Sequence, residues 1–352
     1  MSNTAWETLS NQAVAMAGLV YFIALLVHLA EWAAMRQPAG ELVAAGGGDG
    51  SRDGRSATSS TSEVERGARD TFLSRLGSRL TIAFLGRLGF LLTIVACAVH
   101  FVALLGRGMA ADPNRVPWGN MYEFTVSGTF VVTLLYVGLH KRFGLAWMGP
   151  IVVGFVLTVL MTAVIWLHDE VAPLTEALNS PWLVIHVVSA VIATGTFTLG
   201  GIASIMYLVR MRAERRAAAA GRELSRWMGR VPDLPALDRL AYRVHAFAFP
   251  VWTFAVLITG PIWAHEAWSR YWNWDPKEVW AFITWVVYAG YLHARATAGW
   301  KGRKAAMLAL VGLATLWFNF IGINYFSTTS QHSYAVERFV DDAPAPALVS
   351  LL

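Results

Sequence analysis

The chain has 352 residues, of which 56% are apolar and 14% are charged, and its mean hydropathy is +0.47. Soluble domains usually carry about 25% charged residues, so this composition excludes an ordinary soluble domain and indicates a protein that crosses a membrane several times. The net charge of +5 does not indicate a nucleic-acid partner, because the basic residues lie between apolar runs rather than along one stripe.

The single cysteine, Cys97, lies within an apolar run, and the sequence contains no CxxC or CxxCH motif. We interpret Cys97 as a small buried residue. The chain therefore carries no thiol pair for redox work and cannot itself be a c-type cytochrome. Residues 1–12 contain no Lys or Arg, so we expect no cleavable signal peptide.

Several apolar runs are long enough to cross a hydrocarbon core as helices, which need about 20 residues each. Helices satisfy their own backbone hydrogen bonds in lipid, whereas barrel strands would be shorter and would alternate in polarity. We therefore expect an all-α polytopic membrane protein with about eight transmembrane helices. The expected spans are 12–34, 82–105, 122–139, 145–167, 182–209, 244–264, 279–297 and 305–326.

Lysine and arginine are distributed unequally over the connecting segments. Twenty-two of them lie in 36–80, 140–144, 210–243 and 295–304, and five lie in the segments on the opposite side. Because basic loops remain in the cytoplasm, we predict that the first set is cytoplasmic. Both termini, and the loop between the sixth and seventh spans, then lie on the outer side.

The order of these segments divides the chain into three regions. Residues 1–81 hold the first transmembrane helix and a low-complexity segment, 39–70, which has too few apolar residues to fold alone and is predicted to be a disordered cytoplasmic linker. Residues 82–336 form the main domain, and 337–352 form an outer C-terminal tail. The Arg- and Ala-rich segment 211–230 is either a short amphipathic helix on the inner surface or a solvated connector.

The most unusual stretch is the loop region 263–285, WAHEAWSRYWNWDPKEVWAFITW, which holds six of the sixteen tryptophans. An aromatic belt at a membrane surface needs only one or two tryptophans per helix end. We therefore interpret this stretch, called the tryptophan loop below, as a platform for a flat apolar ligand. We expect Asp275 and Glu278 to cap the helix that follows, because carboxylates favour the helix dipole at its N-terminus.

A second loop on the same side, 106–121, contains several turn-forming residues. We interpret Trp118 and Tyr122 as interfacial anchors. Glu123 stands where the next span begins, and we expect it to be paired because an unpaired acid at the edge of a membrane is costly.

The nine histidines lie at different depths. His186 is about one turn into the fifth span and His332 directly follows the eighth, so both are expected near the outer surface. Two imidazoles on one haem iron stand about 4 Å apart, and these two can meet on either side of a plane that lies on the tryptophan loop. His293 is about 22 Å below the start of its helix, so if it binds haem it belongs to a second, deeper site. His28 and His100 lie within spans and have no assigned role.

The segment 268–278, WSRYWNWDPKE, resembles the WWD signature of the haem-handling proteins of cytochrome c biogenesis. It is most similar to the CcsA/ResC family of system II, whose members are called CcsB in some actinobacteria. The resemblance covers about 82–336 and leaves out the first span and the linker. Further similar segments are PWGNMYE at 117–123, SPWLVIH at 180–186, YLH at 291–293 and HSY at 332–334.

The resemblance implies an external haem b site with His186 and His332 as axial ligands of the iron. The residues that it places against that haem are Trp268, Trp272, Trp274 and Asp275. It also implies that His293 is one ligand of a transmembrane haem, whose second ligand comes from a Ccs1/ResB-type membrane protein.

By this resemblance the protein delivers and attaches haem in cytochrome c maturation. It would be the haem-presenting subunit of a holocytochrome c synthase complex and would present haem to the CxxCH of apocytochrome c for thioether formation. Thioredoxin-like proteins that reduce thiols would act indirectly, since this chain has no redox thiols. We expect a multi-pass protein of the plasma membrane, in preference to the thylakoid membrane, because the linker is rich in Ala, Arg and Gly.

Three other classes of function are open to the sequence. The first is a haem or small-molecule exporter without ligation activity. A test for attachment of haem to a CxxCH peptide would distinguish such an exporter from a protein that ligates haem. The second is a cytochrome b-type electron carrier, which would need His pairs about 13–14 residues apart on one helix; none is present. The third is a membrane scaffold, which would not need the tryptophan loop.

Some residues depart from the pattern of the family, and the role of some others has two possible interpretations. Ser269, Gln331 and Ala335 stand where glycines are common, and Gly allows backbone angles that other residues adopt with difficulty. The turn of the tryptophan loop is therefore open. The cations that would hold haem propionates, or else contact lipid headgroups, are Lys277, Arg270 and Arg115.

Overall fold

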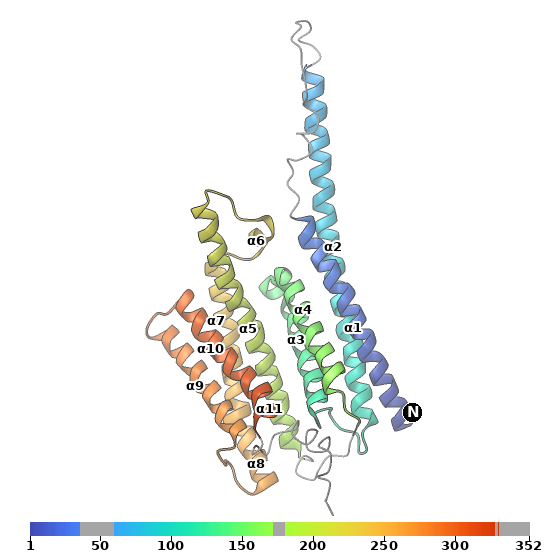
Figure 1. Cartoon of the computed structure of the whole chain (residues 1–352), viewed down its shortest axis with the longest axis vertical. Helices are drawn as coiled ribbons and strands as arrows, with labels where there is room; N and C mark the ends of the chain where they lie inside the picture. Colours follow the sequence, from blue (N-terminus) through green and yellow to red (C-terminus); the bar gives the residue numbers. More distant parts are fainter. Residues whose placement is uncertain (36–59, 172–179, 328–329, 331–352) are drawn as a thin grey trace, which may run out of the picture.

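The structure, a computed structural model, describes residues 1–35, 60–171, 180–327 and 330, and it describes the side chains of the second helix from Leu80 onwards. All regular structure in these residues is helical, and they contain no strand. Figure 1 shows the helices running along one long axis as an elongated bundle. The expected all-α class is confirmed.

The first half of the chain forms one group of helices, in which α1 packs along α2 and α4 contacts both α1 and α3. We call it the N-terminal group. Its segments are α1 (Asn3–Ala34), α2 (Ser60–Ala110), α3 (Met121–Phe143), the 3-10 turn η1 (Leu145–Met148), α4 (Gly149–Thr162) and the π-helical η2 (Ala163–Leu167).

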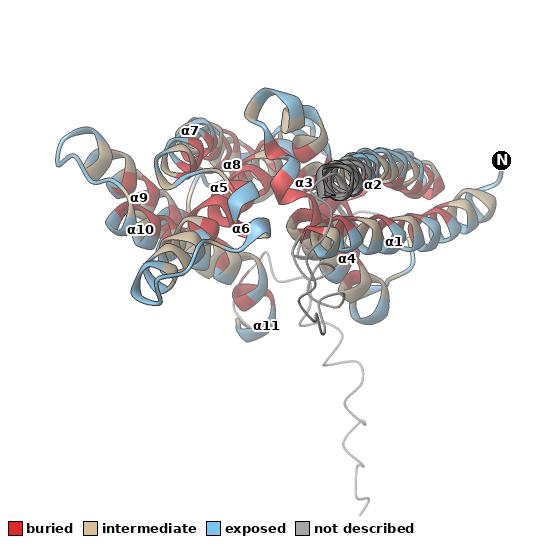
Figure 2. Cartoon of the chain, turned by 90° about the horizontal axis from the view of Figure 1, so that it is seen from above, coloured by how far each residue is buried: buried red, intermediate tan, exposed pale blue. Residues whose placement is uncertain are grey.

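The second half forms the C-terminal group, which packs against the first through α3 and α5. Figure 2 shows the two groups side by side when the bundle is seen from above. The segments are α5 (Pro181–Ala219), α6 (Arg226–Arg230), α7 (Leu234–Thr253), the π-helical η4 (Phe254–Thr259), α8 (Gly260–Trp268), α9 (Pro276–Ala296), α10 (Arg303–Trp317), the π-helical η5 (Phe318–Gly322) and α11 (Ile323–Phe326).

Each of the eight expected spans falls on a helical segment of the structure. Within the described residues, seven segments are long and apolar enough to cross a membrane, one fewer than expected. The exception is α9, the expected span 279–297. With 21 residues the helix is long enough to cross a membrane. Charged side chains such as Lys277, Glu278 and Arg295 lower its hydropathy.

The N-terminus and α8 lie at the same end of the bundle, at the bottom of Figure 1. Ser330 lies at this end too, because its hydroxyl contacts Asp275 at the start of α9. We call it the α8 end and the other the α6 end. An even number of passes along the bundle would place both described ends of the chain at the same end of the bundle. Helix α9 makes the eighth pass. The prediction that the α8 end faces outward stays a prediction.

The linker and the connectors differ from expectation in part. Helix α2 begins at Ser60, so residues 60–70 of the predicted linker are helical, and residues 36–59 lie outside the described residues. Helix α5 continues to Ala219, well past its expected span, and the short helix α6 follows within the segment 211–230. The tail 337–352 also lies outside the described residues.

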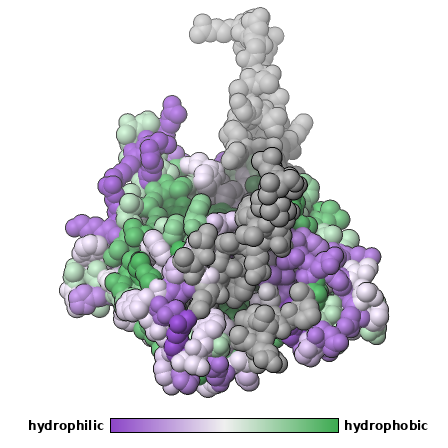
Figure 3. Space-filling model, turned by 60° about the horizontal axis from the view of Figure 1, so that its bottom comes forward, coloured by the Kyte–Doolittle hydropathy of each residue, from purple (hydrophilic) through white to green (hydrophobic). Residues whose placement is uncertain are grey.

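Many large apolar side chains point away from the bundle. Leu19, Phe22 and Leu26 on α1, and Phe84 and Leu91 on α2, are each about half exposed. Figure 3 shows green patches of such apolar residues on the surface among polar ones. An exposed apolar flank of this kind is what contact with lipid requires.

Candidate functional site

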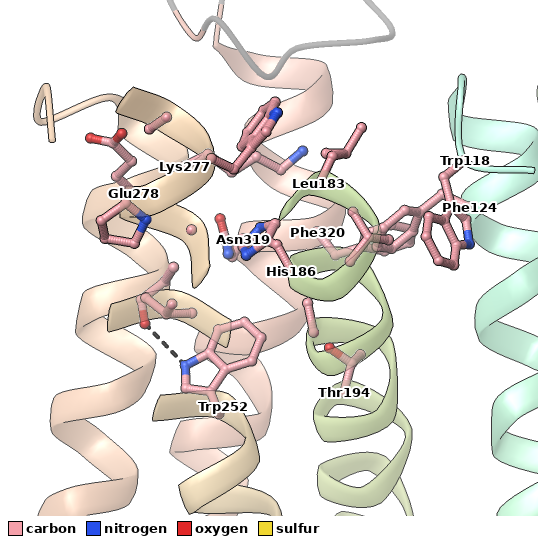
Figure 4. A pocket seen from close by; sticks show the side chains of 18 of the residues that line it. Trp118, Phe124, Leu183, His186, Thr194, Trp252, Lys277, Glu278, Asn319 and Phe320 are labelled. Atoms are coloured by element: carbon pink, nitrogen blue, oxygen red, sulfur yellow. Dashed lines mark hydrogen bonds between the residues drawn. The ribbon is translucent and has the colours of Figure 1, made fainter. Parts of the chain in front are cut away.

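A large cavity opens at the α8 end between the two groups of helices. It holds about 1210 Å³ of space not filled by atoms, counting its open mouth. Its lining is mostly aromatic and apolar, as is usual for small-molecule sites. In Figure 4, His186 and Asn319 lie in the middle, Phe124 and Trp118 form the wall on the α3 side, and Trp252 lies deeper.

His186 lines this cavity from the first turns of α5. Its Nδ1 is 2.9 Å from the carbonyl oxygen of Ala255, so Nδ1 carries the proton and donates. The lone pair of the imidazole is therefore on Nε2. Histidines that bind metals usually donate their other ring N–H to a carbonyl or carboxylate in this way. The ring also stacks on Trp263, at 6.0 Å between centroids and 12° between planes.

The carbonyl that holds His186 belongs to a π-helical segment. In η4 the widened turn lets the Ala255 oxygen accept from the hydroxyl of Thr259 at 3.1 Å as well as from His186. A Cβ on Gly260 would stand 3.2 Å from Cε1 of His186 and 3.0 Å from the Ala255 oxygen. The π-helical turn and the glycine together make the space for this imidazole, and such turns are frequent at functional sites.

The C-terminal group contributes several polar side chains to the cavity wall, among them Thr194, Glu278, Lys277 and Asn319. Asn319, on the π-helical η5, is 8% exposed and lines the cavity. Its Oδ1 has no hydrogen-bond partner among the described residues. A buried amide oxygen without a partner is costly unless something binds to it, so Asn319 indicates a ligand with a polar group.

Lys277 is the cation of the cavity, and its Nζ donates to Oδ1 of Asn324 at 2.8 Å. It stands before the expected span 279–297. Burial lowers the pKa of Lys277 to about 7, and the carboxylate of Asp275 acts in the opposite direction. An anion in the cavity would stabilise the charged form.

The tryptophans of the tryptophan loop differ in their position relative to the cavity. Trp272 lines it. Trp268 packs edge-on against Trp263, with 4.8 Å between their centroids, and so supports the wall behind His186. Trp274 is 71% exposed and is edge-on to Trp272 at 5.9 Å. The loop therefore has an inner and an outer aromatic face.

The backbone of the tryptophan loop has two residues other than glycine in the left-handed region. Ser269 ends α8 with φ of 56°, and Trp274 has φ of 57°. This conformation favours glycine. The turn that the sequence left open at Ser269 is thus one that Gly adopts more easily, but Ser269 adopts it here.

Asp275 and Glu278 form a reciprocal cap at the start of α9, as predicted. The Asp275 carboxylate accepts from the backbone N–H of Lys277 at 2.8 Å, and that of Glu278 accepts from the N–H of Asp275 at 3.1 Å. Asp275 is 4% exposed and also accepts from the hydroxyl of Ser330 at 2.8 Å. It therefore connects the tryptophan loop to the chain that follows α11.

The other two predicted ligand histidines are not in the cavity as described. His293 lies on the last turns of α9, far from the α8 end, and its side chain is exposed. This agrees with the expectation that it cannot share a site with His186. His332 lies outside the described residues.

Glu123 is paired, as predicted, and it shapes the wall of the cavity. Its carboxylate accepts from Arg107 at 3.0 Å, from Arg115 at 2.7 Å and from the N–H of Gly119 at 2.7 Å. These bonds hold the loop that places Trp118 in the cavity. The interpretation of Tyr122 as an interfacial anchor is wrong, because only 2% of it is exposed and it packs against Arg107.

Sequence reasoning missed the groups that act through the backbone or from far along the chain. Ala255, whose carbonyl orients His186, carries no side-chain signal. Asn319 stood inside an apolar run, and that polar residue at membrane depth was the signal that could have found it. Trp252, which donates to the carbonyl of Ala281 at 3.3 Å in the cavity floor, looked like any other aromatic residue of a span.

In the described part of the chain, the cavity is lined by the imidazole of His186, aromatic walls and the cation Lys277. It can hold a flat aromatic ligand, donate a lone pair from Nε2 of His186 to a metal in it, and pair an acidic group with Lys277. A porphyrin with an iron centre and carboxylate arms has these properties, so the residues present fit haem.

Comparison with known proteins agrees with this site. Residues 118–330 match the family model described as "Cytochrome C assembly protein". A protein of Guillardia theta named "Cytochrome c biogenesis protein CcsA" is 34% identical over 260 residues, which are 70% of this chain and 85% of that protein. The chain belongs to the CcsA/ResC family of cytochrome c assembly proteins.

Other CcsA proteins show similar coverage. That of Trieres chinensis is 31% identical over 276 residues, covering 71% of this chain and 87% of the relative. That of Synechococcus elongatus (strain ATCC 33912 / PCC 7942 / FACHB-805) is 32% identical over 271 residues, covering 66% and 82%. The family region begins at Trp118 in the cavity wall and includes α9, but it leaves out α1 and α2.

Proposed function

We propose that this protein binds haem b in the cavity at the α8 end and presents it to apocytochrome c during cytochrome c maturation. The observation that carries the proposal is the held imidazole of His186, which directs a metal-binding nitrogen into an aromatic cavity that also has a cation. The names of the relatives, cytochrome c biogenesis proteins, support the same role.

His186 and His332 are the proposed axial ligands. His332 follows Ser330 by two residues in the sequence, and Ser330 is bound to Asp275 beside the cavity. Trp272 and Trp268 would cover one face or edge of the haem, directly or through Trp263. Trp274 is on the exposed face of the loop, where an approaching protein could reach it.

The residues of this chain bind and orient, while haem supplies the vinyl groups that react with the thiols of a CxxCH motif. Lys277 would pair with a propionate and so fix which edge of the ring faces out. A haem that leaves must exchange one histidine ligand, and the histidine of the CxxCH motif is a chemically equivalent replacement. We therefore propose a role as the haem-presenting subunit of a holocytochrome c synthase complex, with thiols reduced by other, thioredoxin-like proteins.

His293 is proposed as one ligand of a second, transmembrane haem. Its side chain is exposed on α9, which leaves a half-site that a neighbouring protein would complete. A Ccs1/ResB-type membrane protein is the proposed partner, and the plasma membrane is the proposed location. The basic segments at the α6 end favour that end as cytoplasmic.

The test is an optical spectrum of the full chain purified with its partner. His186→Ala should remove the external haem, and added imidazole should restore part of it, while His168→Ala, which changes an exposed histidine outside the cavity, should leave it unchanged. His293→Ala should remove only the transmembrane haem. Unchanged haem content in a His186→Ala/His332→Ala double variant would contradict the ligand assignment.

The same preparation separates ligation from export. Incubated with a reduced CxxCH peptide, it should form a covalent haem–peptide product. An exporter without ligation activity would bind haem and give no such product.

A further inference from the structure

Buried polar side chains outside the cavity form a line through the N-terminal group. We call this line the polar column. Glu31, His28 and Tyr21 come from α1 and are 3%, 2% and 0% exposed. His100, on α2, and Tyr136, on α3, are both fully buried. The remaining member is His140, half-buried on α3 near the α6 end. Ionisable groups inside a membrane protein are expensive, and proton relays are one of their common uses.

The polar column begins near the α6 end with a carboxylate and an imidazole in contact. Oε2 of Glu31 is 3.7 Å from Nδ1 of His28. The other oxygen of Glu31 pairs with Arg230, whose side chain is 40% exposed and so reaches solvent. Glu31 therefore joins the buried imidazole to the surface.

Glycines in the neighbouring helices make room for the side chains of His28 and Glu31. A Cβ on Gly89 or on Gly149 would stand 2.7 Å from Cε1 of His28. A Cβ on Gly86 would stand 2.6 Å from Oε1 of Glu31. The packing of α2 and α4 is thus shaped to admit a histidine and a glutamate where an apolar side chain would cost less.

In the middle of the polar column, Tyr21 lies between His100 and Thr133. The hydroxyl of Tyr21 is 3.4 Å from Nδ1 of His100 and donates to Oγ1 of Thr133 at 3.1 Å. Tyr136 follows Thr133 by three residues on α3 and meets the ring of His140 edge-on, at 5.4 Å between centroids. Towards the α8 end, the hydroxyls of Thr133, Thr129 and Thr125 each donate to the backbone carbonyl one turn earlier on α3, and the last of these carbonyls belongs to Met121.

Five atoms of the polar column lack a hydrogen bond to any described residue. They are both ring nitrogens of His28, Nε2 of His100, Nδ1 of His140 and the hydroxyl of Tyr136. Buried polar atoms without protein partners are usually bound to ordered water. Water between His28, His140 and Tyr136 would join the two ends of the polar column.

We propose that the polar column is a proton-transfer path through the N-terminal group. At each histidine a proton binds one ring nitrogen and another leaves from the second. At Tyr21 the hydroxyl gives its proton to one neighbour and takes one from the other. The net change is one proton moved along the path, with no electron transferred. The charged groups at its two ends are Arg230, near the α6 end, and Arg107 with Glu123, near the α8 end; Cys97 lies one turn from His100 on α2.

The path can be tested apart from haem binding, because its members Tyr21 and Glu31 lie on α1, which contributes no described residue to the lining of the cavity. Its test uses the full chain in vesicles that contain a pH-sensitive dye. A potassium gradient with valinomycin sets a membrane potential, and the initial rate of internal acidification is measured in water and in D2O.

Tyr21→Phe and Glu31→Gln are the test variants, because each keeps the size of the side chain. Tyr288→Phe is the matched control. Tyr288 is also fully buried, and its hydroxyl donates to Ala309 at 3.4 Å in the C-terminal group. Wild-type protein and Tyr288→Phe should raise the proton flux above that of protein-free vesicles, with a slower rate in D2O. Tyr21→Phe and Glu31→Gln should return the flux to the protein-free level.

Three results would overturn the proposal. The first is a wild-type flux equal to that of protein-free vesicles. The second is a wild-type flux in both Tyr21→Phe and Glu31→Gln. The third is an equal loss of flux in Tyr288→Phe, which would show that loss of any buried tyrosine hydroxyl has the same effect.

Discussion

The hydroxyl of Ser330 donates to Oδ1 of Asp275 at 2.8 Å, across 55 residues of sequence. Asp275 at the same time caps α9 within the tryptophan loop. One carboxylate thus connects the aromatic loop to the segment that leads into His332. If His332 is a haem ligand, this bond sets where that segment begins.

Ser330→Ala should weaken the ligation by His332 and leave His186 in place. A hydrogen bond to a charged group contributes about 1.5–3 kcal/mol, so we expect about a tenfold or larger loss of haem affinity. The spectrum should shift from six-coordinate, low-spin haem towards five-coordinate, high-spin haem. Thr158→Ala is the control, because that exposed hydroxyl donates within its own helix to Gly154. A low-spin spectrum with unchanged affinity in Ser330→Ala would contradict this role of the bond.

Gly260→Ala should displace the imidazole of His186. The added Cβ would stand 3.2 Å from Cε1 of His186 and 3.0 Å from the oxygen of Ala255 that orients the ring. Changes to groups that orient a metal ligand typically cost about 10–100-fold in affinity, and we expect a loss of that size in haem titrations. Gly290→Ala is the matched control, since nothing lies within 4 Å of a Cβ at Gly290. Equal affinities for the two variants would show that the space at Gly260 is not needed.

Haem affinity should fall as the pH rises through about 7, because burial lowers the pKa of Lys277 to about that value. Below this pH the ammonium is charged and attracts a propionate, and above it the amine is neutral. Bound propionate favours the charged form, so it moves this fall to higher pH as the site fills.

Lys277→Met should bind haem more weakly at pH 6.5 and approach the affinity of the wild type at pH 9. Lys301→Met, in the exposed turn before α10, should keep the pH profile of the wild type. The readout is the dissociation constant of haem against pH for the three proteins. Parallel profiles for the wild type and Lys277→Met would remove Lys277 from the site.

Ser269→Gly should stabilise the protein by about 1 kcal/mol, since a residue other than glycine in a sparsely populated backbone region costs about 1–3 kcal/mol. Ser269 has φ of 56° at the end of α8. Thermal unfolding followed by tryptophan fluorescence should show a higher midpoint. Ser225→Gly, at φ of −57°, should give no gain, because glycine there only adds freedom to the unfolded chain. A lower midpoint for Ser269→Gly would mean that the serine side chain stabilises the turn.

Much of the fold could be predicted because it depends on local properties. Apolar length placed every expected span on a helix, and the spacing of Asp275 and Glu278 predicted the cap on α9. Composition was less reliable where two tendencies compete. It predicted disorder from residue 39 to 70, but α2 begins at Ser60, since charged and Ala-containing sequence also supports a helix.

The candidate site was predictable only in part, since its contacts join distant segments. The depth of His186 and the aromatic loop both follow from position along the chain. Trp118 was interpreted as a surface anchor, yet it lines the cavity because Glu123 holds its loop against Arg107 and Arg115. A buried ion pair of this kind depends on which helices are neighbours.

The sequence by itself determined the class of the protein, the positions of the long apolar helices by their apolar length, and the family through motifs around Trp268–Glu278 and His186. Only the tertiary structure decided that His186 donates to the carbonyl of Ala255, because the position of a backbone oxygen in a π-helical turn has no signature in the side chains. It also decided that His28 and His100 belong to one buried line. Their alignment depends on how α1 packs along α2, and helix packing is set by the whole surface of both helices.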